Sequence, residues 1–170
     1  MDFLFIVLAF WFFFIGSAFG SFLNVVVWRL PLGISLNYPA SHCPKCRKPI
    51  RWRHNIPVIG WGMLRGKCYD CGLPISRRYP LVEFLCGCVF LSLFYGYFWP
   101  FIRDGLNSTV GLSLLELMCI SVTYMLQVTF FLTFLAAGLI LLDGNRVPKK
   151  LFLPLAILLL LRLCMAGYGI

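Results

Sequence analysis

Charged side chains are scarce in this sequence. They make up 12% of its 170 residues, against 61% hydrophobic residues, and only six are acidic. A soluble domain has about 25% charged and about 45–50% apolar residues, so this composition excludes an ordinary soluble protein. We therefore expect an integral membrane protein, too short for more than about four spans and one small loop domain.

Basic residues are also missing ahead of the first apolar run, residues 3–28. A cleaved signal peptide begins with basic residues and has an apolar core of about 7–15 residues, so this run is expected to be a membrane span instead. The fold class expected is an α-helical integral membrane protein with a small cytoplasmic loop domain. Transmembrane helices are expected at residues 1–28, 81–99, 112–142 and 151–170, joined by loops at residues 29–80, 100–111 and 143–150.

The positive charge is concentrated in residues 29–80, the cysteine loop. It holds ten of the fifteen basic residues and one acid, Asp70. Basic loops remain in the cytoplasm, so this loop and residues 143–150 are expected inside, with residues 100–111 and both termini outside. Topology and contact with anionic membrane lipid account for the net charge of +9, and no nucleic-acid partner is expected.

The eight cysteines fall into two groups. Cys86, Cys88, Cys119 and Cys164 lie in expected spans and are interpreted as small packing residues. The other group forms two Cys-x2-Cys pairs in the cysteine loop, Cys43 with Cys46 and Cys68 with Cys71. This spacing predicts one structural zinc ion, because four thiolates complete its tetrahedral shell and leave no open position for water. Disulfides are not expected in a reducing cytoplasm.

Proline and glycine interrupt the cysteine loop too often for a long helix. We expect short strands and turns folded around the metal, which must supply the stability that so small a unit lacks. Between the cysteine pairs, residues 51–61 fit either a segment at lipid headgroup depth or a docking surface for a partner. The sequence leaves both interpretations open.

A series of motifs appears in a specific order over residues 16–85. It includes Gly20-Ser21-Phe22-Leu23-Asn24, Cys43-Pro44-x-Cys46, Asn55-Ile56-Pro57-Val58, Leu64-Arg65-Gly66-Lys67-Cys68 and Arg78-Tyr79-Pro80-Leu81-Val82-Glu83. The series resembles the N-terminal region of the bacterial type IV prepilin peptidases. The resemblance implies a multi-pass enzyme of the bacterial inner membrane, a prepilin leader peptidase/N-methyltransferase. Such an enzyme cleaves the leader of type IV prepilins or type II secretion pseudopilins at the cytoplasmic face. It then methylates the new N-terminus with S-adenosylmethionine.

Cleavage in that family uses two aspartates. Residues 136–155 are similar to the segment that carries the first, and they match Asp143 to a catalytic aspartate, although Leu141 and Lys149 replace acids of the motif. The Gly-x-Gly-Asp motif of the second aspartate does not occur in the 170 residues. An aspartic protease needs two carboxylates that share a proton, so the chain alone is expected to be a poor protease. Glu83 is the other acid expected at a cytoplasmic helix end, and so a remote candidate for the second carboxylate.

Three hypotheses remain. The first is a short or truncated prepilin peptidase/N-methyltransferase. The second is a non-catalytic or half-enzyme membrane protein that docks prepilin and needs a partner chain, as a homo- or hetero-oligomer. The third is a zinc-loop membrane protein unrelated to pili, which the dense N-terminal resemblance disfavours.

Overall fold

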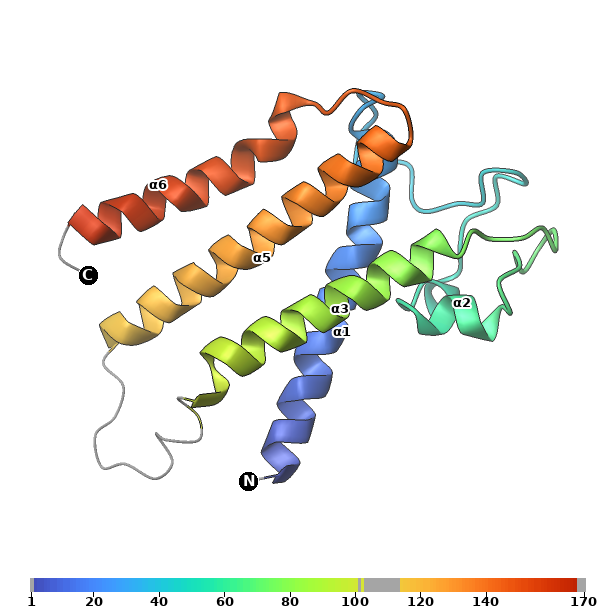
Figure 1. The fold of residues 1–170 in the computed structure, drawn as a ribbon. Coiled ribbons are helices and arrows are strands. Elements are labelled where there is room, and N and C mark those ends of the chain that lie inside the picture. Colours follow the sequence, from blue (N-terminus) through green and yellow to red (C-terminus); the bar gives the residue numbers. More distant parts are fainter. Residues whose placement is uncertain (1, 101, 103–113, 168–170) are drawn as a thin grey trace.

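Helices dominate the computed structural model, which describes residues 2–100, 102 and 114–167 (Figure 1). The long ones are α1 (Asp2–Arg29), α3 (Arg78–Tyr97), α5 (Leu114–Leu142) and α6 (Leu153–Gly167). Within α1, α3 and α5, the segments Phe3–Arg29, Arg78–Tyr97 and Glu116–Leu142 are long and apolar enough to cross a membrane. The predicted class, an α-helical membrane protein, is confirmed.

The fourth expected span is a shorter helix. α6 has 15 residues, which correspond to about 22 Å, against about 30 Å for the hydrocarbon core of a bilayer. A short 3-10 helix, η2 (Lys149–Phe152), precedes it. That α6 crosses the membrane stays a prediction. The expected external loop, residues 100–111, lies almost entirely outside the described residues.

Small residues let α1 and α3 pack closely. A Cβ atom at Gly20 of α1 would lie 2.7 Å from the Cα atom of Glu83, and one at Gly16 would lie 2.7 Å from the carbonyl oxygen of Cys86. On α3, a Cβ atom at Gly87 would lie 2.6 Å from the hydroxyl of Ser17. Gly16 and Gly20 thus form the small-xxx-small pattern that allows two membrane helices to approach with their backbones in contact.

The third helix, α5, completes two clusters of buried side chains. In one, Tyr124 and Val128 of α5 meet Phe90 and Phe94 of α3. The other lies nearer the cysteine loop and includes Ile140 of α5, which is fully buried. α6 lies alongside α5 (Figure 1). The three spanning helices therefore share a core, while α6 extends it on one side.

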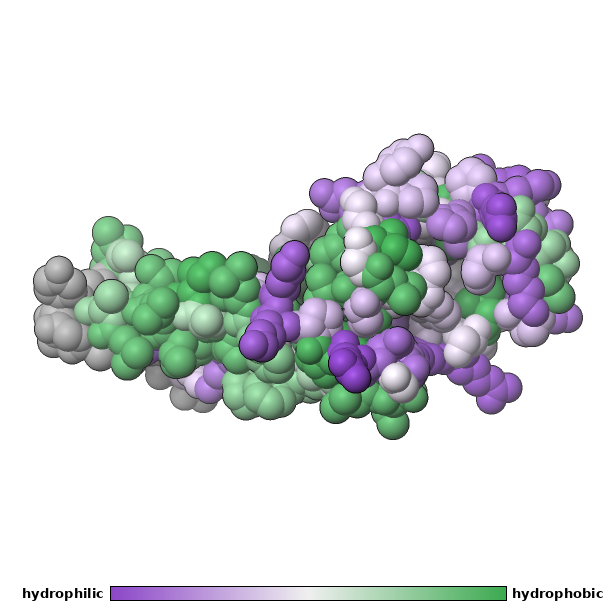
Figure 2. Space-filling view, turned by 90° about the horizontal axis from the view of Figure 1, so that it is seen from above, coloured by the Kyte–Doolittle hydropathy of each residue, from purple (hydrophilic) through white to green (hydrophobic). Residues whose placement is uncertain are grey.

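The cysteine loop connects the end of α1 to the start of α3. It contains a 3-10 helix, η1 (Trp52–His54), a short helix, α2 (Ile59–Met63), and two isolated β-bridges. The short strands expected from the sequence are reduced to these bridges in the described chain, because each cysteine turn is too short for a longer ladder. Seen from above, hydrophilic residues gather over this loop and hydrophobic ones over α5 and α6 (Figure 2).

The close packing at Gly20 yields the first prediction. Gly20→Ala places a methyl group against the backbone of α3 and should destabilise the helix pair by about 1–3 kcal/mol. Thermal unfolding in detergent measures the effect. The matched control is Gly138→Ala in α5, where the new Cβ atom meets nothing within 4 Å and the variant should be neutral or more stable. Equal stability of the two variants would contradict the proposed role of Gly20.

Candidate functional site

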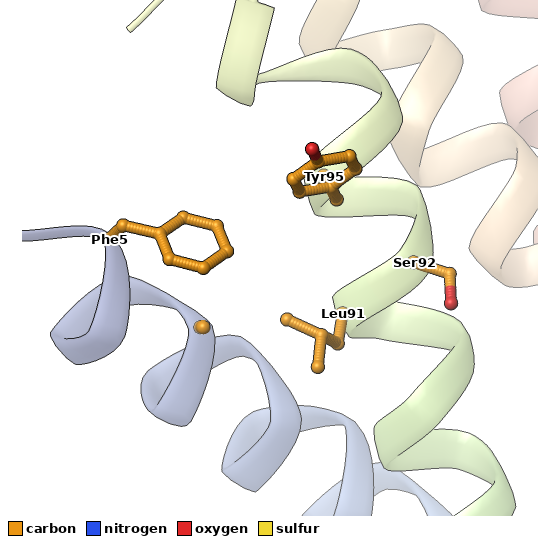
Figure 3. Close-up of a pocket in the computed structure, with 5 residues that line it drawn as sticks. Phe5, Leu91, Ser92 and Tyr95 are labelled. Atoms are coloured by element: carbon orange, nitrogen blue, oxygen red, sulfur yellow. The ribbon is translucent and has the colours of Figure 1, made fainter. Parts of the chain in front are cut away.

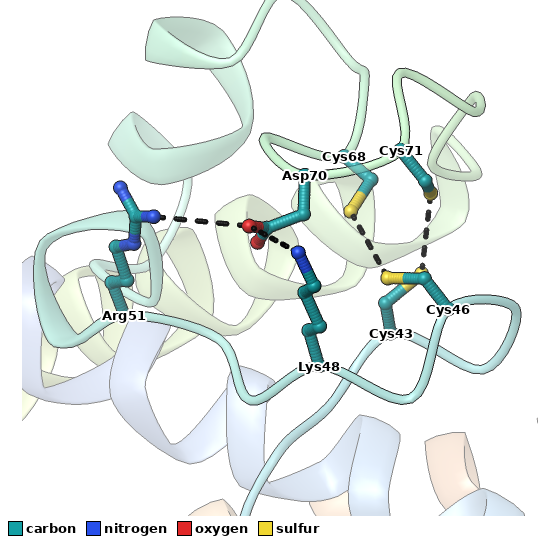
Figure 4. Close-up of polar contacts among 7 residues, drawn as sticks. All are labelled: Cys43, Cys46, Lys48, Arg51, Cys68, Asp70 and Cys71. Atoms are coloured by element: carbon teal, nitrogen blue, oxygen red, sulfur yellow. Dashed lines mark hydrogen bonds and ion pairs between the residues drawn. The ribbon is translucent and has the colours of Figure 1, made fainter.

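Four cysteine sulfurs converge in the cysteine loop. The Sγ atoms of Cys43 and Cys71 lie 3.9 Å apart, those of Cys46 and Cys68 lie 4.0 Å apart, and all four lie within 4.8 Å of one another (Figure 4). Sulfurs on a tetrahedron with metal–sulfur bonds of about 2.3 Å are separated by about 3.8 Å. The cluster could therefore hold a metal ion with little rearrangement.

The two cysteine turns are built alike. In each, the amide of the first cysteine donates to the carbonyl five residues later, at 3.0 Å from Cys43 and 2.8 Å from Cys68. The amide four residues after that cysteine donates back to its carbonyl, at 2.9 Å in both turns. The sequence carries a signal for this repeat that cysteine spacing alone misses: Cys-x2-Cys-x2-Pro-Ile begins at Cys43 and again at Cys68.

The repeat differs at one strained position. Both turns need a left-handed residue directly after the second cysteine. The second turn has Gly72 there, with φ of 68°, whereas the first has Arg47, with φ of 58°. Glycine adopts this conformation freely, but a residue with a Cβ atom does not. The first turn is therefore strained where the second is relaxed.

Backbone amides favour the thiolate form of one cysteine in the cluster, and a thiolate is the form that binds a cation. Hydrogen bonds from the amides of Cys46 and Lys45 lower the pKa of the Cys43 thiol to about 6. At Cys71, the amide of Leu73 acts in the same direction, but desolvation and the neighbouring thiols outweigh it and raise its pKa to about 11. The Cys43 thiolate thus forms readily, whereas Cys71 retains its proton. A metal ion must displace thiol protons to bind, so its affinity for the cluster should rise with pH.

Asp70 ties the two turns together. It lies in the second turn, and its carboxylate is 3.5 Å from the Lys48 ammonium and 3.8 Å from the Arg51 guanidinium (Figure 4). Arg51 also lies over the ring of Tyr69, 4.0 Å from its centroid. This set of contacts links residues 48–51 to the second cysteine pair without using the sulfurs.

Two buried charged residues fix the cysteine loop to the helices. The guanidinium of Arg29, at the end of α1, donates to carbonyl oxygens at the start of the loop, including Ser35 at 3.0 Å and Pro39 at 2.7 Å. From α3, the carboxylate of Glu83 accepts the amide of Val58 at 2.7 Å. Both side chains are almost fully buried. The loop is therefore attached near its start and at its middle.

The amide that Glu83 accepts belongs to a strained turn. Val58 has φ of 62° and ψ of −52°, and Ile59 donates to the carbonyl of Pro57 at 2.6 Å. This is a γ-turn of the rare, strained kind, and a β-branched residue is unfavourable at its centre. The buried carboxylate stabilises it by accepting the amide. The structure thus gives Glu83 an anchoring contact, which sequence reasoning missed.

Two hollows lie along α1. A groove of about 640 Å³ separates the helix from the cysteine loop, and its lining includes Ser21, Phe22, Asn37, Trp52 and Asn55. The other, of about 450 Å³, lies between α1 and α3 far from the sulfurs, and its lining is mainly apolar (Figure 3). The first is within the size range of small-molecule sites, and both polar and apolar side chains line it.

Asp143 directly follows α5 and forms an ion pair with α3. Both of its carboxylate oxygens accept from the guanidinium of Arg78, at 2.5 Å and 2.9 Å. These hydrogen bonds hold the pKa of Asp143 below its usual value. No hydrogen bond joins Asp143 to Glu83 in the described part of the chain, so the structure does not pair the two acids suggested by the sequence.

Comparison with known proteins gives a consistent family. Residues 14–97 match the model of the bacterial peptidase A24 N-terminal domain. A prepilin leader peptidase/N-methyltransferase of Klebsiella pneumoniae is 48% identical over 111 residues, covering 62% of this chain and 46% of that protein. One of Neisseria gonorrhoeae is 36% identical over 167 residues, covering 80% of this chain and 56% of that protein. The chain thus spans about half the length of these relatives. No solved structure matches.

The strained first turn yields a second prediction. Arg47→Gly should stabilise the cysteine loop by about 0.5–1 kcal/mol, because glycine adopts the left-handed conformation without strain. Gly72→Ala should destabilise the loop by about 1 kcal/mol for the converse reason. Thermal unfolding followed by tryptophan fluorescence measures both, since Trp52 and Trp61 lie in the loop. If both variants moved the unfolding temperature of the loop in the same direction, the two turns would not share the same left-handed requirement.

Proposed function

We propose that this chain processes type IV prepilins or type II secretion pseudopilins, on the premise that its residues 14–97 match the bacterial peptidase A24 N-terminal domain. The proposed reactions are cleavage of the leader and methylation of the new N-terminus, the activities in the names of its relatives. The observation that carries the proposal is the 48% identity to the Klebsiella pneumoniae enzyme over 111 residues. The proposed location is the bacterial inner membrane, with the cysteine loop in the cytoplasm.

The proposed metal is one structural zinc ion held by Cys43, Cys46, Cys68 and Cys71. The sulfur separations support it, since they are close to those of a tetrahedral zinc site. Four thiolates fill the shell, so the ion contributes folding energy to the loop and leaves catalysis to other groups.

Asp143 is the proposed base for leader cleavage. Its carboxylate takes a proton from water as the water oxygen forms a bond to the scissile carbonyl carbon. A second, protonated carboxyl group then donates a proton to the amide nitrogen as the carbon–nitrogen bond breaks. Asp143 ends protonated and its partner ionised, and proton exchange with solvent restores both.

The second carboxylate is proposed to come from polypeptide other than residues 1–170. Glu83 is unsuited because it is buried against α1 and accepts the amide of Val58. The Gly-x-Gly-Asp motif that carries the second aspartate in the resembling family does not occur in this sequence. A docking role without catalysis is less well supported, because the relatives are named as enzymes.

S-adenosylmethionine is the proposed methyl donor, and the groove between α1 and the cysteine loop is its proposed site. At about 640 Å³ the groove is within the range of small-molecule sites. The indole of Trp52 offers a surface on which an adenine could stack, and Asn37 and Asn55 offer amide groups for hydrogen bonds.

The zinc proposal predicts that the purified chain carries about one zinc ion. Cys43→Ser should lose most of it, and chelation should unfold the cysteine loop while the long helices persist. Metal analysis and circular dichroism measure these effects. The matched control is Cys164→Ser, which changes a cysteine outside the cluster and should retain the metal. A chain without metal, or full metal content in Cys43→Ser, would refute the site.

The cleavage proposal predicts that the purified chain alone cleaves a prepilin weakly or not at all. Cleavage should appear when a polypeptide carrying Gly-x-Gly-Asp is added. In that mixture, Asp143→Asn should lower the cleavage rate by about 100-fold or more, because it removes the base. Methylation of an already trimmed pilin should be unchanged.

Asp104→Asn is the control for that experiment, because it makes the same chemical change in the loop expected on the external side. It should cleave as the wild type does. Equal cleavage by Asp143→Asn would refute the assignment of the base, and strong cleavage by the wild-type chain alone would refute the need for a second polypeptide.

A further inference from the structure

The ion pair between Arg78 and Asp143 joins two charges at unfavourable helix ends. Asp143 follows the last residue of α5, where the helix dipole is negative and disfavours an anion. The turn is fixed there by Gly144, which has φ of 74° and donates to the carbonyl of Leu141. Arg78 is the first residue of α3, where the dipole is positive and disfavours a cation. Neither charge is placed where its own helix stabilises it.

The contact between the two side chains is nevertheless well formed. Two guanidinium nitrogens donate to the two carboxylate oxygens, at 2.5 Å and 2.9 Å, in the bidentate geometry that fixes both planes. Both side chains are 35% exposed, and exposed ion pairs contribute little to stability. A gain in stability therefore does not explain this ion pair. The orientation and charge that Arg78 gives to the Asp143 carboxylate do explain it.

We propose that Arg78 is a positioning residue that orients both carboxylate oxygens of Asp143 and places the negative charge of the dyad on Asp143 rather than on its partner. The catalytic part of this inference rests on the proposed function. A carboxylate has about four lone-pair positions, so the bidentate contact leaves one on each oxygen for water. In a dyad that shares one proton, the carboxyl group beside a fixed cation carries the negative charge. Arg78 thus makes Asp143 the base and leaves the proton on its partner.

Arg78 is the charged group that lowers the pKa of Asp143. The elements that pack against α5 are α1, α3, α6 and η2. Besides Arg78, the charged and titratable groups at their near ends, and in the turn between α5 and η2, are Arg29, Arg77, Tyr79, Arg146, Lys149 and Lys150. All of these except Tyr79 are cations. The buried acid of α3, Glu83, is bound to the cysteine loop instead. The lowered pKa of Asp143, caused first by its hydrogen bonds to Arg78, agrees with this arrangement.

The ionisation of Asp143 can be measured without any enzymatic activity. The purified chain is labelled with ¹³C at the aspartate carboxyl groups, of which the sequence has four, and titrated by NMR. The Asp143 signal is assigned as the one missing from Asp143→Asn. In the wild type it should titrate below the ordinary aspartate pKa of about 3.9. In Arg78→Gln the pKa should rise to or above that value.

Two further variants separate this effect from a general structural one. Arg78→Lys keeps the charge but loses the bidentate contact, so the Asp143 pKa should lie between those of the wild type and Arg78→Gln. The matched control, Arg77→Gln, removes the adjacent exposed arginine and should leave the pKa unchanged. An ordinary pKa in the wild type, or no shift in folded Arg78→Gln and Arg78→Lys, would overturn the inference.

A kinetic measurement tests the assignment of the base. In a preparation that cleaves prepilin, the acidic limb of the pH–rate profile should move upward in Arg78→Gln by the shift seen in the titration, and Arg77→Gln should leave it unmoved. If the NMR pKa of Asp143 shifts in Arg78→Gln but the acidic limb of the pH–rate profile does not move, Asp143 is not the base. If no preparation cleaves, the proposed function fails, and the titration still decides whether Arg78 controls Asp143.

Discussion

Close packing of α1 on α3 is the contact on which the rest of the molecule depends. The helices can touch because Gly16 and Gly20 present no side chain where α3 approaches. The cysteine loop leaves the end of one helix and returns to the start of the other, so this contact brings its two ends together. Arg29 and Glu83 then attach the loop to these helices. The sulfur cluster is therefore held by a membrane-helix pair as well as by its own turns.

Much of this architecture could be predicted from the sequence, because it depends on local signals. Apolar runs indicated helices, and the spacing of Cys43, Cys46, Cys68 and Cys71 predicted that four sulfurs would meet, as they do. Short strands and turns were expected in the loop because its prolines and glycines leave no room for a long helix. The turns are closed instead by hydrogen bonds within about ten residues and leave room for one bridge each.

The contacts of the two acids could not be predicted in this way. Glu83 meets a backbone amide 25 residues away, and any residue type can supply an amide, so the sequence has no signal for it. Arg78 and Asp143 are 65 residues apart, and their pairing depends on how α3 and α5 end beside each other. Sequence reasoning considered Glu83 and Asp143 together because both are acids at expected cytoplasmic helix ends. The structure instead gives each its own partner.

The attachment of the cysteine loop to both helices also affects how strongly it could bind a metal. A free peptide with two Cys-x2-Cys pairs must close a loop before the second pair reaches an ion held by the first, and that closure has an entropic cost. Here Arg29 and Glu83 restrict the loop beforehand, which raises the effective concentration of one cysteine pair at the other. Metal affinity is then partly a property of the helices, and a change deep in the bilayer could be detected as a faster loss of the ion.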